Sequence, residues 1–230
     1  MARILHIDTS TSVCLVALSD NGQVVAQRID TEGQNHSKLI GIFVQEVLAD
    51  AGCTTHDLDA VALSAGPGSY TGLRIGTSFV KGLCFAMGIP VITLPTLQIL
   101  AQAALLQNTN IESNAHLCPM IDARRMEVYT AAYSANAQEI TEAWPEIVTE
   151  ASYANYLDKP TYFFGNGADK CKTTLTAGNA HFIADIIPSA TAMMLLAEKA
   201  YEQQQFADVA YFEPFYLKEF MATMPKNKLF

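Results

Sequence analysis

The chain has 230 residues, half of them hydrophobic and 16% charged, with a formal net charge of −9. This composition is typical of a globular protein with a large core. The negative net charge argues against a protein that binds nucleic acid by itself, because contacts between basic residues and phosphates supply most of the affinity for nucleic acid. No uninterrupted apolar run reaches about 18 residues, which argues against a membrane span.

The chain start and the cysteines favour a cytoplasmic protein. His6 and Asp8 interrupt the apolar continuity that a signal peptide needs. The five cysteines are an odd, widely spaced set without a Cys-x-x-Cys pair, which fits reduced core thiols better than a disulfide framework or a zinc knuckle.

The first half predicts an antiparallel start followed by alternating helices and strands. The Asn21-Gly22 pair favours a hairpin turn, because both residues tolerate a positive φ. Thr96 is the expected cap of the last helix in this half. The apolar patterns predict strands over 3–8, 13–19, 23–29, 60–63 and 90–94, and helices over 37–51, 70–87 and 96–107.

The second half repeats this theme. Its patterns predict strands over 116–122, 127–133 and 161–164, a further sheet segment near Ile147, and a helix over 190–204 capped by Ser189. The polar stretch 108–114 is the best candidate for a boundary. We therefore expect two domains, 1–108 and 109–230, which suggest a duplicated α/β unit.

A glycine-rich loop stands between the strand ending at Leu63 and the helix beginning at Tyr70. A helix start with exposed amides is a standard anion site, but the spacing matches neither a dinucleotide fingerprint nor a P-loop. A tight turn without a ligand explains the same pattern. The polar cluster after the first strand has two interpretations as well, a magnesium site through water or an Asx turn. The candidate residues for binding a nucleotide or an anion lie in these two loops: Asp8, Thr9 and Ser10 after the first strand, and Gly66, Gly68 and Ser69 in the glycine-rich loop.

No motif for a resident metal or a nucleophile stands out. The five histidines are scattered and none forms His-x-x-x-His, and Gly-x-Ser-x-Gly does not occur. We expect no catalytic and no metal-binding residue in this chain. The Asp122-Ala123-Arg124-Arg125 segment either holds an anion or is a strand end with solvated charges.

The helices over 37–51 and 70–87 are apolar on more than one side. The second has one stripe through Val80 and another through Phe79, and only one of them can face the domain's own sheet. A deep core helix is the alternative, but a domain of about a hundred residues favours an interface. We assign the Val80 stripe to the partner, with an expected interface of Leu39, Phe43, Val47, Leu73, Gly76, Val80, Cys84 and Met87.

Four segments together resemble the TsaB family of tRNA threonylcarbamoyladenosine-biosynthesis subunits. They are residues 4–11, 66–76, 121–129 and 215–218, and their order covers almost the whole chain. The resemblance implies the actin/hexokinase-like (ASKHA) fold, an α/β fold of two related halves, each a mixed sheet flanked by helices.

The resemblance also implies a non-catalytic scaffold subunit that docks a TsaD-like catalytic subunit or a second copy of itself. The complex would include a TsaE-like ATPase and would reach tRNA only as a whole, with no membrane contact. TsaD carries a His-x-x-x-His pair after the strand that follows its Gly-Pro-Gly helix, whereas residues 91–100 here contain no histidine. We expect this chain alone to bind no cofactor. Binding of ATP or ADP at an interface of the complex stays open as an alternative. The rival interpretations are an ATP-dependent small-molecule kinase of this fold and a glycoprotease-like metallopeptidase.

Overall fold

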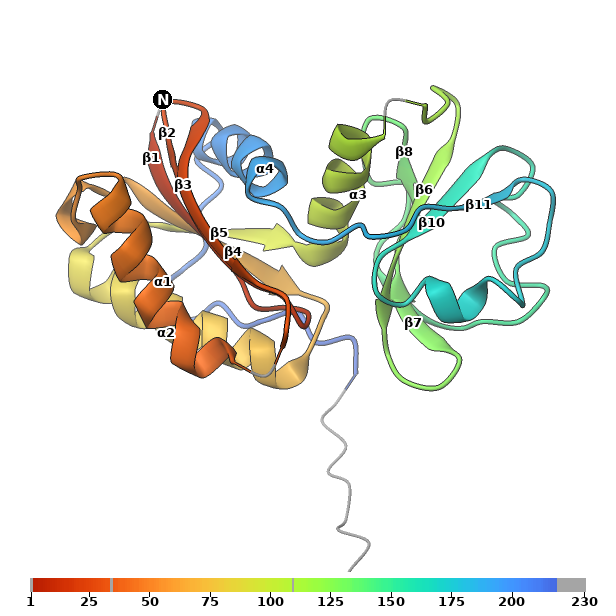
Figure 1. Ribbon diagram of the computed structural model, residues 1–230, viewed down its shortest axis with the longest axis horizontal. Coiled ribbons are helices and arrows are strands. Elements are labelled where there is room, and N and C mark those ends of the chain that lie inside the picture. The colour runs from red at the N-terminus through yellow and green to blue at the C-terminus, as the bar shows by residue number, and fades with distance from the viewer. Residues whose placement is uncertain (1, 34, 109, 219–230) are drawn as a thin grey trace, which may run out of the picture.

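The computed structural model describes residues 2–33, 35–108 and 110–218. It has two α/β halves side by side, with helices α3 (Thr96–Gln107) and α4 (Ala190–Glu202) between the two sheets (Figure 1). No helix in the described ranges combines the length and hydropathy that crossing a membrane would require.

The first sheet has five strands in the order β3-β2-β1-β4-β5. Strands β1 to β3 are antiparallel, whereas β4 and β5 continue the sheet parallel to β1. The hairpin turn lies at Asn21 and Gly22, as expected, and both have positive φ. The strands are β1 (Arg3–Asp8), β2 (Cys14–Asp20), β3 (Gln23–Asp30), β4 (Ala60–Gly66) and β5 (Val91–Pro95).

Helices cover both faces of this sheet, because its central strands are apolar on both sides. Helices α1 (His36–Asp50) and α2 (Tyr70–Met87) cover the outer face, where Leu5 and Ile7 belong to their core. Helices α3 and α4 cover the inner face. Thr96 does not cap α3. Its hydroxyl instead bonds the Ser64 hydroxyl at 2.8 Å and accepts from the Gly66 amide at 3.2 Å.

The second sheet has the order β11-β10-β6-β7-β9, with β8 paired to β6. The expected strand over 127–133 is two strands, because the chain leaves β7 after Thr130 and rejoins β6 at Tyr133. The Ser189 cap is confirmed, since its hydroxyl accepts from the Ala192 amide. The strands are β6 (His116–Asp122), β7 (Glu127–Thr130), β8 (Tyr133–Ser134), β9 (Trp144–Ile147), β10 (Thr161–Phe164) and β11 (Ala180–Phe182).

The chain after α4 returns to the first half, and we call residues 205–218 the C-terminal strap. Ala207 forms a bridge with Val91, and the Phe215 amide donates to the Ala65 carbonyl at 2.7 Å. The division into 1–108 and 109–230 stays a prediction. This packing nevertheless places α4 and the strap against the first sheet.

His6 is a fully buried histidine at the centre of the first sheet. Its Nε2 lies 2.8 Å from the Ser19 hydroxyl, and its Nδ1 has no hydrogen-bond partner among the described residues. Burial lowers the pKa of His6 from 6.5 to about 3, since the charged ring would lose its hydration. The folded protein therefore holds this ring neutral across the physiological range.

We expect His6 to make the protein acid-sensitive. Between pH 6.5 and 3 the unfolded chain binds a proton at this ring and the folded chain does not, so the free energy of unfolding falls as the pH drops. The loss at pH 5 is about 2 kcal/mol relative to pH 7.5. Urea unfolding at several pH values checks this, with His6→Gln as the comparison. Wild-type and variant stabilities that stay parallel from pH 7.5 to 5 would contradict it.

Candidate docking face and glycine loop

The loop after β1 and the glycine loop before α2 touch each other directly. The Ser69 amide donates to the Ser10 carbonyl at 2.6 Å, and the Thr9 hydroxyl donates to the Gly72 carbonyl at 2.8 Å. The Ser69 hydroxyl then accepts from the Gly72 amide, which caps α2. The structure thus brings the two predicted anion loops together, and the Ser69 amide and the Thr9 hydroxyl are used in bonds between them.

The glycines at the start of α2 allow this contact because a Cβ would not fit. A Cβ on Gly68 would lie 2.2 Å from the Ser10 carbonyl oxygen, and one on Gly72 would lie 2.0 Å from the Thr9 carbonyl oxygen. A Cβ on Gly76 would lie 2.4 Å from the Thr9 hydroxyl oxygen. The spacing of these glycines is therefore explained by packing within the chain. A nucleotide or anion at Asp8, Thr9, Ser10, Gly66, Gly68 and Ser69 stays a prediction.

Asp8 lies buried beneath this loop contact. Its Oδ1 accepts from the Ser10 amide at 2.8 Å and from the Ser10 hydroxyl at 2.7 Å, which is the Asx turn considered as an alternative. Burial raises the pKa of Asp8, and the hydrogen bonds from Ser10 only partly oppose this. Through these two bonds the Asp8 carboxyl group fixes the shape of the loop after β1. It would do so in the Asx turn and in a magnesium site alike.

Helix α2 presents to the sheet the stripe that we had assigned to the partner. Leu73, Val80 and Cys84 are at most 1% exposed and pack in the core of the first half. That assignment was wrong for these three residues and for Gly76, which faces Thr9 and Leu63. Val47 of α1 is equally buried. The three remaining members of the expected interface are half-buried: Leu39, Phe43 and Met87.

The α1–α2 pair exposes two large apolar side chains on its outer side. Phe85 has 83% of its surface accessible, and Ile42 of α1 has 49%. Helix α2 has no acidic residue. We had not expected Phe85 and Ile42 in the interface, although the stripe through Phe79 already indicated a second apolar side. We call this outer surface the docking face, formed by the exposed residues Ile42, Ser78, Gly82, Phe85 and Ala86.

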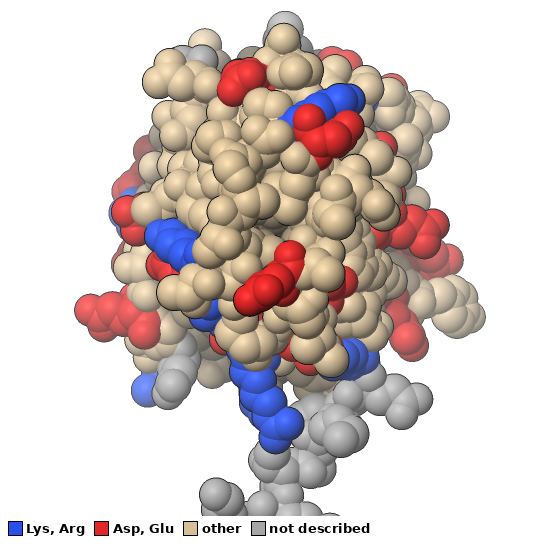
Figure 2. Space-filling model, turned by 90° about the vertical axis from the view of Figure 1, so that its right-hand side faces the viewer, with Lys and Arg blue, Asp and Glu red and all other residues tan. Residues whose placement is uncertain are grey.

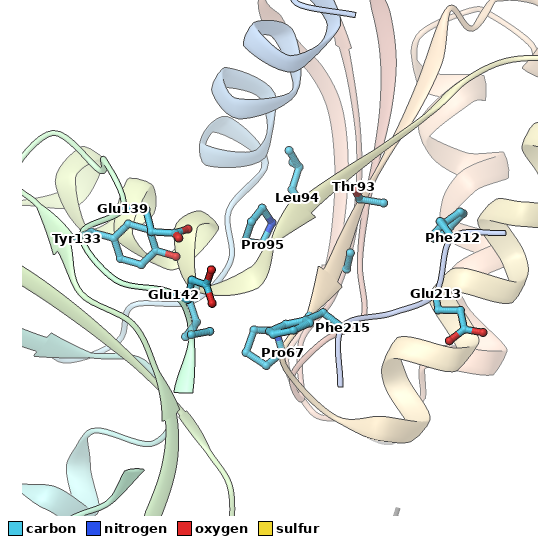
Figure 3. Close-up of a pocket in the computed structure, with 14 residues that line it drawn as sticks. Pro67, Thr93, Leu94, Pro95, Tyr133, Glu139, Glu142, Phe212, Glu213 and Phe215 are labelled. Atoms are coloured by element: carbon cyan, nitrogen blue, oxygen red, sulfur yellow. The ribbon is translucent and has the colours of Figure 1, made fainter. Parts of the chain in front are cut away.

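A cavity of about 470 Å³ lies between the two halves. Figure 3 shows Pro67 and Phe215 on the side of the first half and Tyr133 and Glu142 on the side of the second. Its lining also includes Glu139 and Glu213, so its charged side chains are all carboxylates. Such a lining is unfavourable for the phosphates of a nucleotide.

The Asp122–Arg125 segment forms the tip of the β6–β7 hairpin. Arg124 and Arg125 have φ of +71° and +47°, a left-handed conformation that costs a non-glycine residue about 1–2 kcal/mol. Asp122 at this tip is already paired with Lys170. Across the described ranges, His, Cys, Asp and Glu form no group of three or more arranged to hold a metal ion.

Two α/β halves, each a mixed sheet flanked by helices, define this protein as a member of the actin/hexokinase-like fold class. The family model of TsaD, tRNA N6-adenosine threonylcarbamoyltransferase, matches residues 23–226. The chain belongs to this family.

Relatives named tRNA threonylcarbamoyladenosine biosynthesis protein TsaB match almost the whole chain. The Escherichia coli protein is 33% identical over 96% of each chain. The Haemophilus influenzae protein is 31% identical over 94% of this chain and 93% of its own. The solved structure of YeaZ from Pseudomonas aeruginosa is 26% identical, with a TM-score of 0.83 over 94% of this chain and all of that one. The predicted resemblance to TsaB and the predicted fold are confirmed.

We expect Gly72 and Gly82, both within α2, to respond oppositely to substitution by alanine. Gly72→Ala forces a methyl group into the Thr9 carbonyl and should lower the free energy of unfolding by about 1–3 kcal/mol. A Cβ on Gly82 meets nothing within 4 Å, so Gly82→Ala should raise it by about 0.5–1 kcal/mol. Chemical denaturation of both variants measures the difference. Equal effects would show that the loop contact does not constrain the helix.

Proposed function

We propose that this chain is a non-catalytic scaffold subunit needed for threonylcarbamoyl transfer to the adenosine beside the anticodon of tRNA. It acts by docking a TsaD-type catalytic subunit through the docking face. Two findings support the proposal, the TsaB names of the relatives and the match to the TsaD model. Both connect the chain to the same modification.

The exposed apolar surface of α1 and α2 carries this proposal. Phe85 has 83% of its surface accessible, and a partner that covered this apolar surface would gain binding free energy by removing it from water. Small residues at Ser78, Gly82 and Ala86 let another helix approach α2 closely. Since the TsaD model matches this chain, a TsaD-type subunit has corresponding helices to offer. A second copy of this chain would use the same face, so homodimer and heterodimer compete.

The chemistry then belongs to the partner. Residues 91–100 supply no histidine pair, so we place the metal and the transfer step in the TsaD-type subunit. A TsaE-type ATPase completes the proposed assembly, and tRNA binds the assembly rather than this acidic chain alone. The proposed compartment is the cytoplasm. The kinase alternative is less favoured, because the two loops that would hold phosphate contact each other and the cavity beside them is acidic.

Phe85→Glu should abolish docking and leave the fold intact. The side chain is exposed in the isolated chain, whereas in the complex an unpaired carboxylate would lie in an apolar interface. We expect affinity for the TsaD-type subunit to fall at least a hundredfold, measured by calorimetry, with an unchanged melting temperature. Homodimers should dissociate in the same variant.

Two further variants make this test decisive. Ile147→Glu is the matched control, since Ile147 is 69% exposed on β9 of the other half and should tolerate the charge with no loss of docking. Val80→Glu should unfold the protein, because Val80 is fully buried. If Phe85→Glu binds the partner as tightly as wild type, the docking face is misassigned. If wild type itself does not bind, the proposed function is wrong.

A further inference from the structure

The Arg124–Arg125 tip is the only left-handed pair of arginines in the part of the chain that the structure describes. Both side chains are exposed, and neither has an ion pair within the described ranges. The β2–β3 hairpin places Asn21 and Gly22 at its own two left-handed positions, with φ of +53° and +75°. Asparagine and glycine fit this geometry with little strain. The arginines are therefore not explained by the turn itself.

The tip is held rigidly by its own backbone and by neighbouring side chains. The Arg124 amide donates to Asp122 Oδ1 at 3.1 Å, and the Glu127 amide donates to the Arg124 carbonyl at 3.1 Å. Lys170 pairs with Asp122 and also donates to the Glu127 carbonyl at 2.7 Å. A rigid backbone fixes the positions from which the two arginine side chains extend, so little loop entropy remains to be lost on binding.

The local charge is positive although the chain is acidic. The two carboxylates nearest in sequence, Asp122 and Glu127, are paired with Lys170 and Lys218. These pairs leave Arg124 and Arg125 as an unneutralised charge of +2. Figure 2 faces this half of the molecule and shows basic side chains gathering toward its lower edge, and Figure 1 places the β6–β7 turn at the same edge.

We propose that Arg124 and Arg125 bind the phosphate backbone of tRNA in the assembled complex. Arginine suits this role because its planar guanidinium group can donate two parallel hydrogen bonds to one phosphate. Two such contacts are far too few to hold RNA alone, which agrees with the acidic surface elsewhere. They add a positioning contact to a complex whose main RNA-binding surface lies on other subunits. This inference rests on the proposed function.

The test replaces the tip with the residues of the other hairpin. Arg124→Asn with Arg125→Gly removes both charges and places at the two left-handed positions residues that tolerate a positive φ, so the fold should be preserved. The matched control is Lys159→Gln with Lys199→Gln, which removes the same charge from two exposed lysines without an ion pair in the described chain. Binding of purified tRNA to the complex with the TsaD-type subunit is measured by fluorescence anisotropy from low to high salt.

We expect the tip variant to weaken tRNA binding about tenfold to a hundredfold and to reduce the slope of log affinity against log salt by about 1.4–1.8, corresponding to two lost phosphate contacts. The control should change neither by a comparable amount. Unchanged affinity and slope in an intact complex would overturn this inference alone. Weakened binding of the TsaD-type subunit by the tip variant would also overturn it, because the tip would then be a protein contact. Failure of the wild-type chains to form a complex would overturn the proposed function and this inference with it.

Discussion

The contact between the start of α2 and the loop after β1 is the constraint on which the rest of the structure depends. Gly68 and Gly72 bring the helix backbone against Ser10 and Thr9, where any side chain would collide with a carbonyl oxygen. A helix held this closely along its first turns cannot rotate. Val80 must then face the sheet, and Phe85 must face outward. The docking face is thus a geometric consequence of glycines that lie more than a helical turn away from it.

The two halves are held together by a shared core more than by polar contacts. Leu15 of the first sheet and Leu117 of the second belong to one hydrophobic cluster with residues of α3 and α4. The Lys218–Glu127 ion pair joins the strap to the second half, but an exposed pair of this kind contributes little. The burial of apolar side chains between the two sheets therefore sets the relative position of the halves. The acidic cavity is the space between the halves that this core does not fill.

Local patterns predicted most elements of the fold, because strand and helix periods and the Asn21-Gly22 turn are local properties. Periodicity also revealed two apolar stripes on α2, but it cannot say which stripe meets the protein's own sheet. Gly72 and Gly76 indicate the answer, because glycines mark the side of the helix that approaches the loop after β1 most closely, although we had expected Gly76 in the interface with a partner. The return of the C-terminal strap to the first sheet has no local signal at all, because it depends on contacts between distant residues.

The two proposed contact surfaces rely on different forces. The docking face gains free energy mainly by removing apolar area from water, which moderate salt changes little. The arginine tip acts through charge, and at about 0.1 M salt such an interaction is screened beyond about 10 Å. Assembly of the complex can therefore persist at a salt concentration that releases the RNA. If both proposals hold, an acidic chain with a docking face in one half and a basic tip in the other keeps partner binding and RNA contact physically separate, so each can be changed without the other.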